Sequence, residues 1–152
     1  MAESSTRPAT PRDVEVLAGL AHDAYQHYTA RIGRPPAPMT ADYAAAVDDG
    51  VVWVAESAGR VVGFVVLLDA DDHLLLENVA VDPRAQGQGV GARLLALAEE
   101  EAGRRGHRRI ELYTNEAMTE NLDYYPRKGY VEVRRGEQDG YRRVWFSKAL
   151  GR

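Results

Sequence analysis

Three glycines at alternate positions follow a short apolar segment. Gly87, Gly89 and Gly91 come after Val79-Ala80-Val81 and a turn at Asp82-Pro83, and an amphipathic helical pattern begins directly behind them. Glycines allow backbone amides to converge without interfering side chains. The first amides of a helix have no internal partner, and the helix dipole adds partial positive charge there. The stretch therefore predicts an anion cradle suited to a phosphate or diphosphate.

Two nucleotide-binding patterns compete for the same glycines. A Walker-type loop ends in Gly-Lys-Ser/Thr, and no lysine follows here, which excludes it. The stretch from Gly87 to Ala92 fits the dinucleotide pattern G-x-G-x-x-G/A, with Glu111 as a ribose ligand. That pattern places its first glycine directly after the strand, whereas residues 82–86 intervene in this chain. Dinucleotide binding is therefore retained only as a weaker alternative.

A third pattern fits better. Gln86-Gly87-Gln88-Gly89-Val90-Gly91 matches Q/R-x-x-G-x-G/A behind a V-A-V-D-P strand end, and it resembles the coenzyme A pyrophosphate loop of the GNAT N-acetyltransferase superfamily. The resemblance implies acetyl-CoA as acetyl donor. It also implies that backbone groups of the loop and of the preceding strand bind this donor, namely those of Val79, Ala80, Val81, Gln86, Gly87, Gln88, Gly89, Gly91 and Ala92.

A second segment, Tyr124-Tyr125-Pro126-Arg127-Lys128-Gly129-Tyr130, resembles the aromatic-Tyr-x-Arg/Lys-x-Gly-aromatic segment of the same family. The resemblance makes Tyr125 the general acid, because a phenol can protonate the thiolate that an amine expels from a thioester. The chain departs from the family where Met118 and Asn121 replace the usual Asn and Ala. Asn115 and Asn121 are both candidates to bind the cofactor's amides, and Arg127 or Lys128 is a candidate for its 3′-phosphate.

The attacking amine must be neutral, so a general base or a water relay is expected. Glu77, beside a predicted irregularity in its strand, and Glu111, on a neighbouring strand, are the two candidates, with Glu77 preferred. Family members use either place, and many use water alone. The acceptor is expected to enter near the first helices, between His22 and Met39.

Bulk properties narrow the class of protein. The 152 residues are 45% hydrophobic and 28% charged, which predicts one globular domain over residues 1–152. A net charge of −4 argues against nucleic acid as a partner. No apolar run reaches the length of a membrane span, and cytoplasm is the expected location. The absence of cysteine excludes a thiol nucleophile, and the four histidines lack metal-ligand spacing, so no metal is expected.

The apolar pattern predicts the elements that position these residues. Strands are expected near Ser5–Arg7 and then at 51–56, 60–68, 73–81, 108–114, 131–137 and 141–149. A helix begins at Thr10 and ends before Gly33, Thr40 caps a second short helix, and a third runs from Gly89 to Gly106. Thr119 is expected to cap a fourth, which Pro126 kinks or ends.

The strand at 73–81 changes its apolar phase, from Leu74 and Leu76 to Val79 and Val81, which predicts a β-bulge near Glu77-Asn78. The order of elements matches the GNAT order. The expected fold class is therefore α/β (α+β), with a mixed, mostly antiparallel sheet of about six to seven strands, about four flanking helices and a bulge in the fourth strand.

The predicted function is transfer of an acetyl group from acetyl-CoA to a primary amine by direct attack in a ternary complex. The alternative is a non-catalytic acyl-CoA-binding regulatory module. The acceptor stays open between small-molecule and peptide amines, and the basic pair Arg142-Arg143 is interpreted as part of a solvated face. The last hairpin leaves a sheet edge that would allow a homodimer.

Overall fold

The computed structural model describes residues 4–151. Its strands, in chain order, are β1 (Ser4–Pro8), β2 (Val52–Ser57), β3 (Arg60–Asp69), β4 (Leu74–Val81), β5 (Arg109–Asn115), β6 (Val131–Gln138) and β7 (Tyr141–Ala149). Its α-helices are α1 (Val14–Tyr25), α2 (Thr29–Ile32), α3 (Tyr43–Asp48), α4 (Val90–Arg104) and α5 (Thr119–Arg127). None of the helices in this part of the chain is long and apolar enough to cross a membrane.

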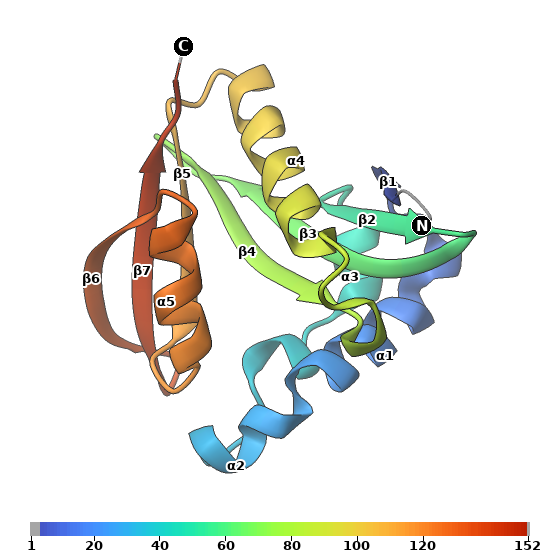
Figure 1. Ribbon diagram of the computed structural model, residues 1–152, viewed down its shortest axis with the longest axis horizontal. Helices are drawn as coiled ribbons and strands as arrows, with labels where there is room; N and C mark the ends of the chain where they lie inside the picture. Colours follow the sequence, from blue (N-terminus) through green and yellow to red (C-terminus); the bar gives the residue numbers. More distant parts are fainter. Residues whose placement is uncertain (1–3, 152) are drawn as a thin grey trace.

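All of these strands join one sheet in the order β1-β2-β3-β4-β5-β7-β6. Only β4 and β5 are parallel, and their pairing covers just Leu74–Leu76 against Ile110–Leu112. The two strands meet at one end and diverge at the other, which gives the molecule the V shape seen in Figure 1. The predicted mixed, mostly antiparallel fold is confirmed, and it differs from the parallel doubly wound sheet on which dinucleotide binding depends.

The predicted bulge is also confirmed, and it explains the change of phase. Val66 pairs with Asn78 but Leu67 pairs with Leu76, so Glu77 is the extra residue in β4. Because of this extra residue, Leu76 and Val79 pack on the same face of the sheet. The bulge bends β4 where its pairing with β5 ends, and thus contributes to the opening between the two strands.

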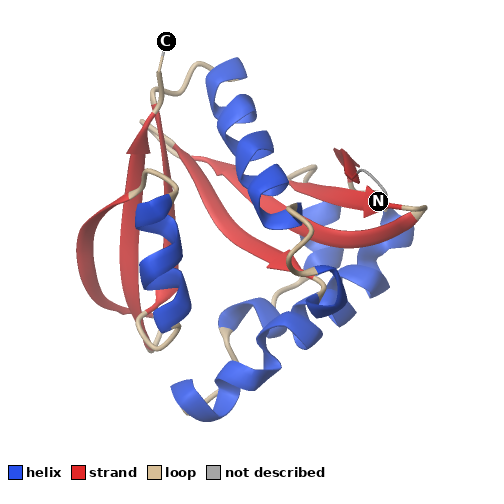
Figure 2. Ribbon diagram, viewed as in Figure 1, coloured by secondary structure: helices blue, strands red, loops and turns tan. Residues whose placement is uncertain are grey.

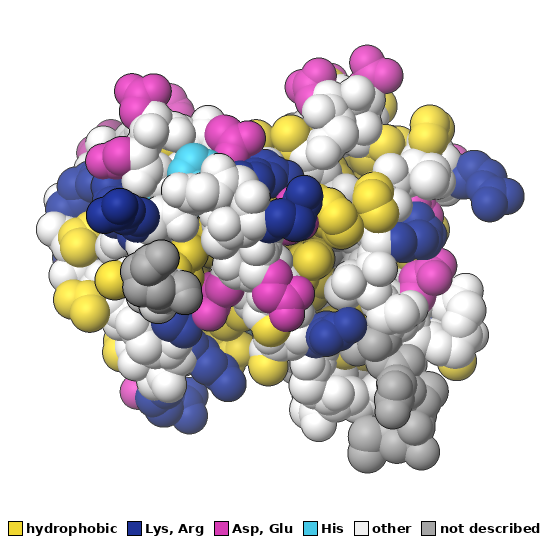
Figure 3. Space-filling model, turned by 90° about the horizontal axis from the view of Figure 1, so that it is seen from above, with side chains coloured by type: hydrophobic (Ala, Val, Ile, Leu, Met, Phe, Trp, Pro, Cys, Tyr) yellow, Lys and Arg dark blue, Asp and Glu magenta, His cyan; other side chains and the backbone are white. Residues whose placement is uncertain are grey.

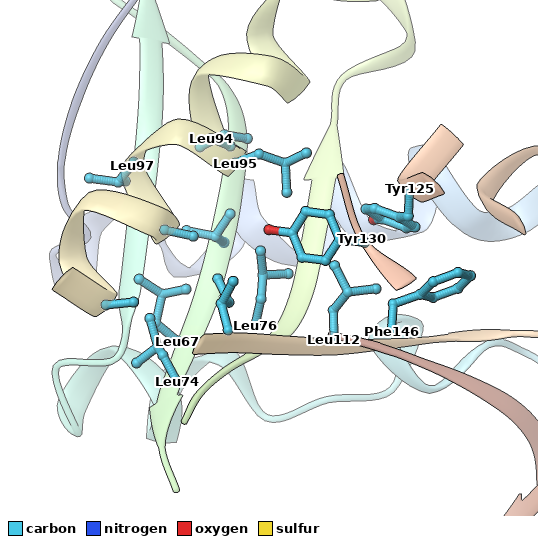
Figure 4. Packing of buried hydrophobic residues seen from close by; sticks show 14 of the residues in the cluster. Leu67, Leu74, Leu76, Leu94, Leu95, Leu97, Leu112, Tyr125, Tyr130 and Phe146 are labelled. Atoms are coloured by element: carbon cyan, nitrogen blue, oxygen red, sulfur yellow. The ribbon is translucent and has the colours of Figure 1, made fainter. Parts of the chain in front are cut away.

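Helices cover both faces of the sheet (Figure 2). Helices α4 and α5 share one apolar core with β4, β5 and β7, and α1 and α3 bury a second cluster against β2 and β3. In the first core, the Tyr125 ring of α5 packs against Tyr130 and Phe146, with ring centroids 5.9 and 5.8 Å apart. Figure 4 shows Tyr130 between the leucines of α4 on one side and Tyr125 and Phe146 on the other. The orientation of Tyr125 is thereby determined by packing.

Three helix boundaries differ from expectation. The predicted first helix is interrupted by a 3-10 turn at Gln26–Tyr28 before it ends at Gly33. Asp42 rather than Thr40 caps α3, because its carboxylate accepts the Ala45 amide at 3.0 Å while the Thr40 hydroxyl bonds locally to Ala37. Met118 occupies the cap position of α5, and Thr119 is its first helical residue.

Charges of both signs are interspersed over the face shown in Figure 3, so this face has no uniform field for a polyanion. Strand β6 lies at one edge of the sheet, as predicted for the last hairpin. Its side chains Val131 and Val133 are 65% and 49% exposed.

Candidate active site

The glycine loop adopts the geometry expected for an anion cradle. Gly87 and Gly89 both have φ of +82°, a conformation in which residues with a Cβ are strained. The first hydrogen bond of α4 runs from the Arg93 amide to the Gly89 carbonyl, so the amides of residues 90–92 precede it and have no acceptor within the helix. They form the positive end of the α4 dipole.

This loop forms one wall of a groove with a volume of about 1210 Å³. Gln86 and Ala92 also line the groove, whereas Gln88 is exposed beside it. The opposite wall comes from α5 and ends at Arg127 and Lys128. The groove therefore joins a helix N-terminus to two cationic side chains, which suits a ligand that carries phosphates at separated positions.

The edge of β4 that borders the groove carries free backbone groups. The Asp82 amide donates to the Val62 carbonyl at 2.8 Å, and hydrogen-bonded and non-hydrogen-bonded pairs alternate along an antiparallel ladder. Ala80 therefore bonds to Phe64 of β3, whereas Val79 and Val81 direct their amides away from β3. Of the three predicted strand residues, Val79 and Val81 can offer an amide to a ligand, and the Ala80 amide is already used.

A second, narrower pocket lies at the opening between β4 and β5, with a volume of about 60 Å³. It meets the groove at four residues that line both spaces: Tyr25, Val79, Asn121 and Tyr125. Three predicted site residues, Tyr125, Asn121 and Val79, are thus brought together from α5 and β4. Any group exchanged between the groove and the pocket must pass these residues.

Tyr125 is 6% exposed, and burial raises the pKa of its phenol above the ordinary value of 10. The phenol is therefore protonated at neutral pH. Among residues 4–151 the Tyr125 hydroxyl has no hydrogen-bond partner, and its oxygen keeps some contact with solvent. A protonated hydroxyl at the junction of two cavities is suited to donate a proton to a bound molecule.

The two carboxylate candidates lie in different places. Glu77 lines the narrow pocket but stays exposed to solvent. Its partial burial raises the pKa of its carboxyl, while nearby Arg143 lowers it. Glu111 is 6% exposed and forms an ion pair with Arg109, with His73 at 3.6 Å. Because Glu111 stands opposite Leu75 in the paired part of β4 and β5, it lies where the V is closed. Of the two, only Glu77 lines the pocket that meets the groove at this junction.

The two asparagines line the narrow pocket, as does Met118. The Asn115 side chain accepts the Ala117 amide at 2.9 Å and so shapes the turn before α5. The Asn121 side chain donates to the Thr114 hydroxyl at 3.0 Å. Asn121 also reaches the groove, so it is the better placed of the two to contact a ligand there.

Three pocket residues, Tyr25, Asn78 and Arg143, were given no specific role by the sequence. Tyr25 donates to the Val79 carbonyl and to Asn78 Oδ1, and the Asn78 amide donates to Tyr43 at 3.0 Å. Arg143 is only 7% exposed, which corrects its interpretation as part of a solvated face. The sequence did carry a signal for the burial of Arg143, because it alternates with Tyr141 and Trp145 and therefore shares one face of β7 with these aromatic residues.

Comparison with known proteins agrees with this geometry. The profile of the acetyltransferase (GNAT) family matches residues 17–130. The chain belongs to the GNAT family. The match includes the glycine loop and Tyr125.

Solved structures share the GNAT fold at low sequence identity. The PaiA N-acetyltransferase from Thermoplasma acidophilum, in complex with coenzyme A, superposes with a TM-score of 0.81 at 15% identity, over 97% of this chain and 99% of that one. The ribosomal-protein-S18-alanine N-acetyltransferase from Escherichia coli superposes with a TM-score of 0.76 at 19% identity, over 99% and 96% of the two chains.

Curated GNAT relatives match part of the chain. The mycothiol acetyltransferase of Jonesia denitrificans is 40% identical over 88 residues, which cover 56% of this chain and 27% of that protein. The N-acetyltransferase MJ1207 of Methanocaldococcus jannaschii is 29% identical over 92 residues, or 56% and 41% of the two chains. The match thus spans less than half of either relative's length.

Proposed function

We propose that residues 1–152 form one GNAT acetyltransferase domain that transfers an acetyl group from acetyl-CoA to a primary amine in a ternary complex. The observation that carries the proposal is the junction at Val79 and Tyr125, where a groove with a glycine cradle meets a separate pocket. Two substrates can therefore approach one another from opposite sides without a covalent enzyme intermediate. Family membership supports the same reaction class.

The groove would hold the donor through backbone groups. The amides of the loop from Gln86 to Ala92 would bind the diphosphate, and Arg127 or Lys128 would meet the 3′-phosphate. The Val81 amide would bind the pantetheine arm. The Val79 amide would bind the thioester oxygen and stabilise the negative charge that grows on it when the amine attacks. The coenzyme A complex of the PaiA neighbour supports this use of the fold.

Two side chains would move protons. Glu77, or a water molecule bound to it, would take a proton from the amine. The neutral nitrogen then forms a bond to the acetyl carbon, the carbon–sulfur bond breaks, and the second nitrogen proton passes to solvent. Tyr125 would donate its proton to the sulfur, and an amide and a free thiol would result. The raised pKa of Glu77 supports its role, since the carboxylate becomes a stronger base. The position of the Tyr125 hydroxyl at the junction supports its role as donor.

The alternative is an acyl-CoA-binding module without catalysis. It would use the same groove but would need neither a proton donor at the junction nor a carboxylate in the second pocket. The presence of Tyr125 and Glu77 at these places favours the enzyme. A homodimer through the exposed edge of β6 remains a prediction.

The test is a titration with acetyl-CoA followed by an amine screen. Calorimetry with acetyl-CoA, coenzyme A and NADH should show saturable one-site binding of the first two alone. A panel of amines is then assayed by release of free thiol, which is free of protein background because the chain has no cysteine. Binding without turnover of any amine would favour the regulatory module, and a preference for NADH would contradict both proposals.

A further inference from the structure

Arg143 places a buried positive charge in the narrow pocket without an acidic partner. Its side chain is 7% exposed, and it donates to the Gln138 side-chain oxygen. The guanidinium lies 4.2 Å from the Tyr113 ring centroid and 5.6 Å from that of Tyr141. Among residues 4–151, no carboxylate lies within ion-pair distance of it, whereas its neighbour Arg142 pairs with Glu116 at 2.8 Å. Buried charges are normally paired, so Arg143 is an exception.

The position of Arg143 relative to Glu77 is equally specific. Both residues line the pocket, from β7 and β4 respectively. Burial raises the pKa of Glu77 and Arg143 lowers it in part, so the two charges interact, but they are too far apart to form an ion pair. The pocket therefore presents a cation and an anion to whatever occupies the space between them. A molecule with one charge of each sign is the complement of this arrangement.

The entrance of the pocket favours a small occupant. Residues 36–38 form one wall, and the Tyr141 hydroxyl donates to the Pro35 carbonyl at 2.6 Å. The Arg34 guanidinium stacks on the Tyr141 ring at 4.0 Å from its centroid. These contacts join the loop before α3 to β7 across the pocket. They leave a confined space rather than an open channel for a polypeptide.

We propose that Arg143 binds a carboxylate of the acceptor, which makes the acceptor a small amino-acid-like molecule with one amine and one carboxylate. The inference rests on the proposed acetyl transfer and names its substrate class. A guanidinium can bind a carboxylate through two parallel hydrogen bonds, which orients the substrate as well as holding it. With the carboxylate at Arg143, the amine lies on the Glu77 side, toward the junction with Val79 and Tyr125.

The experiment compares matched pairs of acceptors that differ only in the carboxylate. Phenylalanine with phenethylamine, leucine with 3-methylbutylamine, and lysine with cadaverine are assayed by thiol release with acetyl-CoA. At least one amino acid should exceed its decarboxylated partner by about 10- to 100-fold in kcat/KM, the size expected for hydrogen bonds to a charged group. The Arg143→Gln variant should reduce this ratio to near one, and Arg143→Lys should keep part of it.

Arg142→Gln is the matched control. Arg142 is the adjacent residue on the opposite face of β7 and is exposed, so its loss should leave the ratio unchanged. A purely structural role of Arg143 would lower kcat/KM for both members of each pair equally. That result, or equal rates for both members in the native protein, overturns the inference while the acetyltransferase proposal stands.

Product binding provides a readout that does not depend on turnover. N-acetylphenylalanine and N-acetylphenethylamine are titrated into the protein saturated with coenzyme A. Tighter binding of the carboxylated product by the native protein, lost in Arg143→Gln, supports the inference, and equal binding of the two products overturns it. A failure of the proposed function is distinguishable, because the protein would then either not bind acetyl-CoA or bind it without acetylating any amine of the panel.

Discussion

The Tyr25 hydroxyl donates a hydrogen bond to the backbone carbonyl of Val79. This bond connects the end of α1 to the edge of β4 just beyond the bulge, where β4 no longer has β5 as a neighbour. The same hydroxyl lies 3.2 Å from Asn78 Oδ1, and Asn78 is buried. Tyr25 thus donates the hydrogen bond that a neighbouring strand would otherwise give the Val79 carbonyl. It orients the Val79 peptide at the opening between β4 and β5.

Removing the Tyr25 hydroxyl should make the edge of β4 around Val79 less well ordered. We expect Tyr25→Phe to lower the free energy of unfolding by about 1–3 kcal/mol, because a buried carbonyl loses its donor. The KM for acetyl-CoA should rise as the Val79 and Val81 amides become less well oriented. Urea denaturation and steady-state kinetics measure both effects. Unchanged values in both would show that this bond positions nothing.

Removing only the hydroxyl of Tyr125 tests its role as a proton donor. Tyr125→Phe should retain acetyl-CoA affinity and melting temperature, because the ring still packs against Tyr130 and Phe146. Its kcat should fall by about 10²- to 10³-fold, as is usual for loss of a general acid. Tyr124→Phe is the control, since Tyr124 lies in the groove but outside the narrow pocket. Equal rates for Tyr125→Phe and the native protein would refute the assignment.

The cradle depends on left-handed glycines. Gly89→Ala introduces a Cβ at φ of +82°, which costs about 1–2 kcal/mol and favours a different loop conformation. Calorimetry should therefore show weaker acetyl-CoA binding, by about tenfold or more. Gly103→Ala is the matched control within α4: its Cβ would enter open space, so it should stabilise the protein by about 0.5–1 kcal/mol without affecting binding. If both variants bind acetyl-CoA equally well, the loop does not hold the diphosphate.

The pH dependence of the rate should identify Glu77. Burial raises the pKa of Glu77 above 4.5, so its basic form is lost, and kcat/KM falls, as pH decreases through that raised pKa. Glu77→Gln should lower kcat/KM and abolish this acidic limb. Glu111→Gln should keep the limb, because Glu111 is held by Arg109 on the closed side of the V. A limb that persists in Glu77→Gln would assign the base to water or to another group.

The raised pKa of Glu77 also predicts how its carboxyl affects the stability of the protein. The folded protein binds the Glu77 proton more tightly than the unfolded chain does. The ionised carboxylate therefore lowers the free energy of unfolding at pH values above its folded pKa, and the protonated carboxyl has no such effect below pH 4.5. Glu77→Gln should therefore be as stable as the native protein or more stable at pH 7. Thermal melting at pH 7 and at pH 4 measures the difference. A clear loss of stability at pH 7 would mean that Glu77 has a stabilising partner.

Features that depend on neighbours in the chain were predictable from the sequence. The glycine loop needs only a backbone that can adopt positive φ and the first turn of a helix behind it, and both are local properties of residues 86–92. The bulge at Glu77 was predictable because an inserted residue reverses the alternation of side chains along a single strand. The order of elements then indicated the fold class.

The rest depended on which strands became neighbours. Glu77 and Glu111 look equivalent in the sequence, and only the short parallel pairing of β4 with β5 separates them. In the sequence, Arg143 resembles the adjacent, exposed Arg142. In the fold, β6, β5 and the loop at Pro35 surround the face of β7 on which Arg143 lies. Burial, the environment of a charge and the meeting of Tyr25 with Val79 arise from contacts between residues far apart in the chain, and sequence spacing carries no record of such contacts.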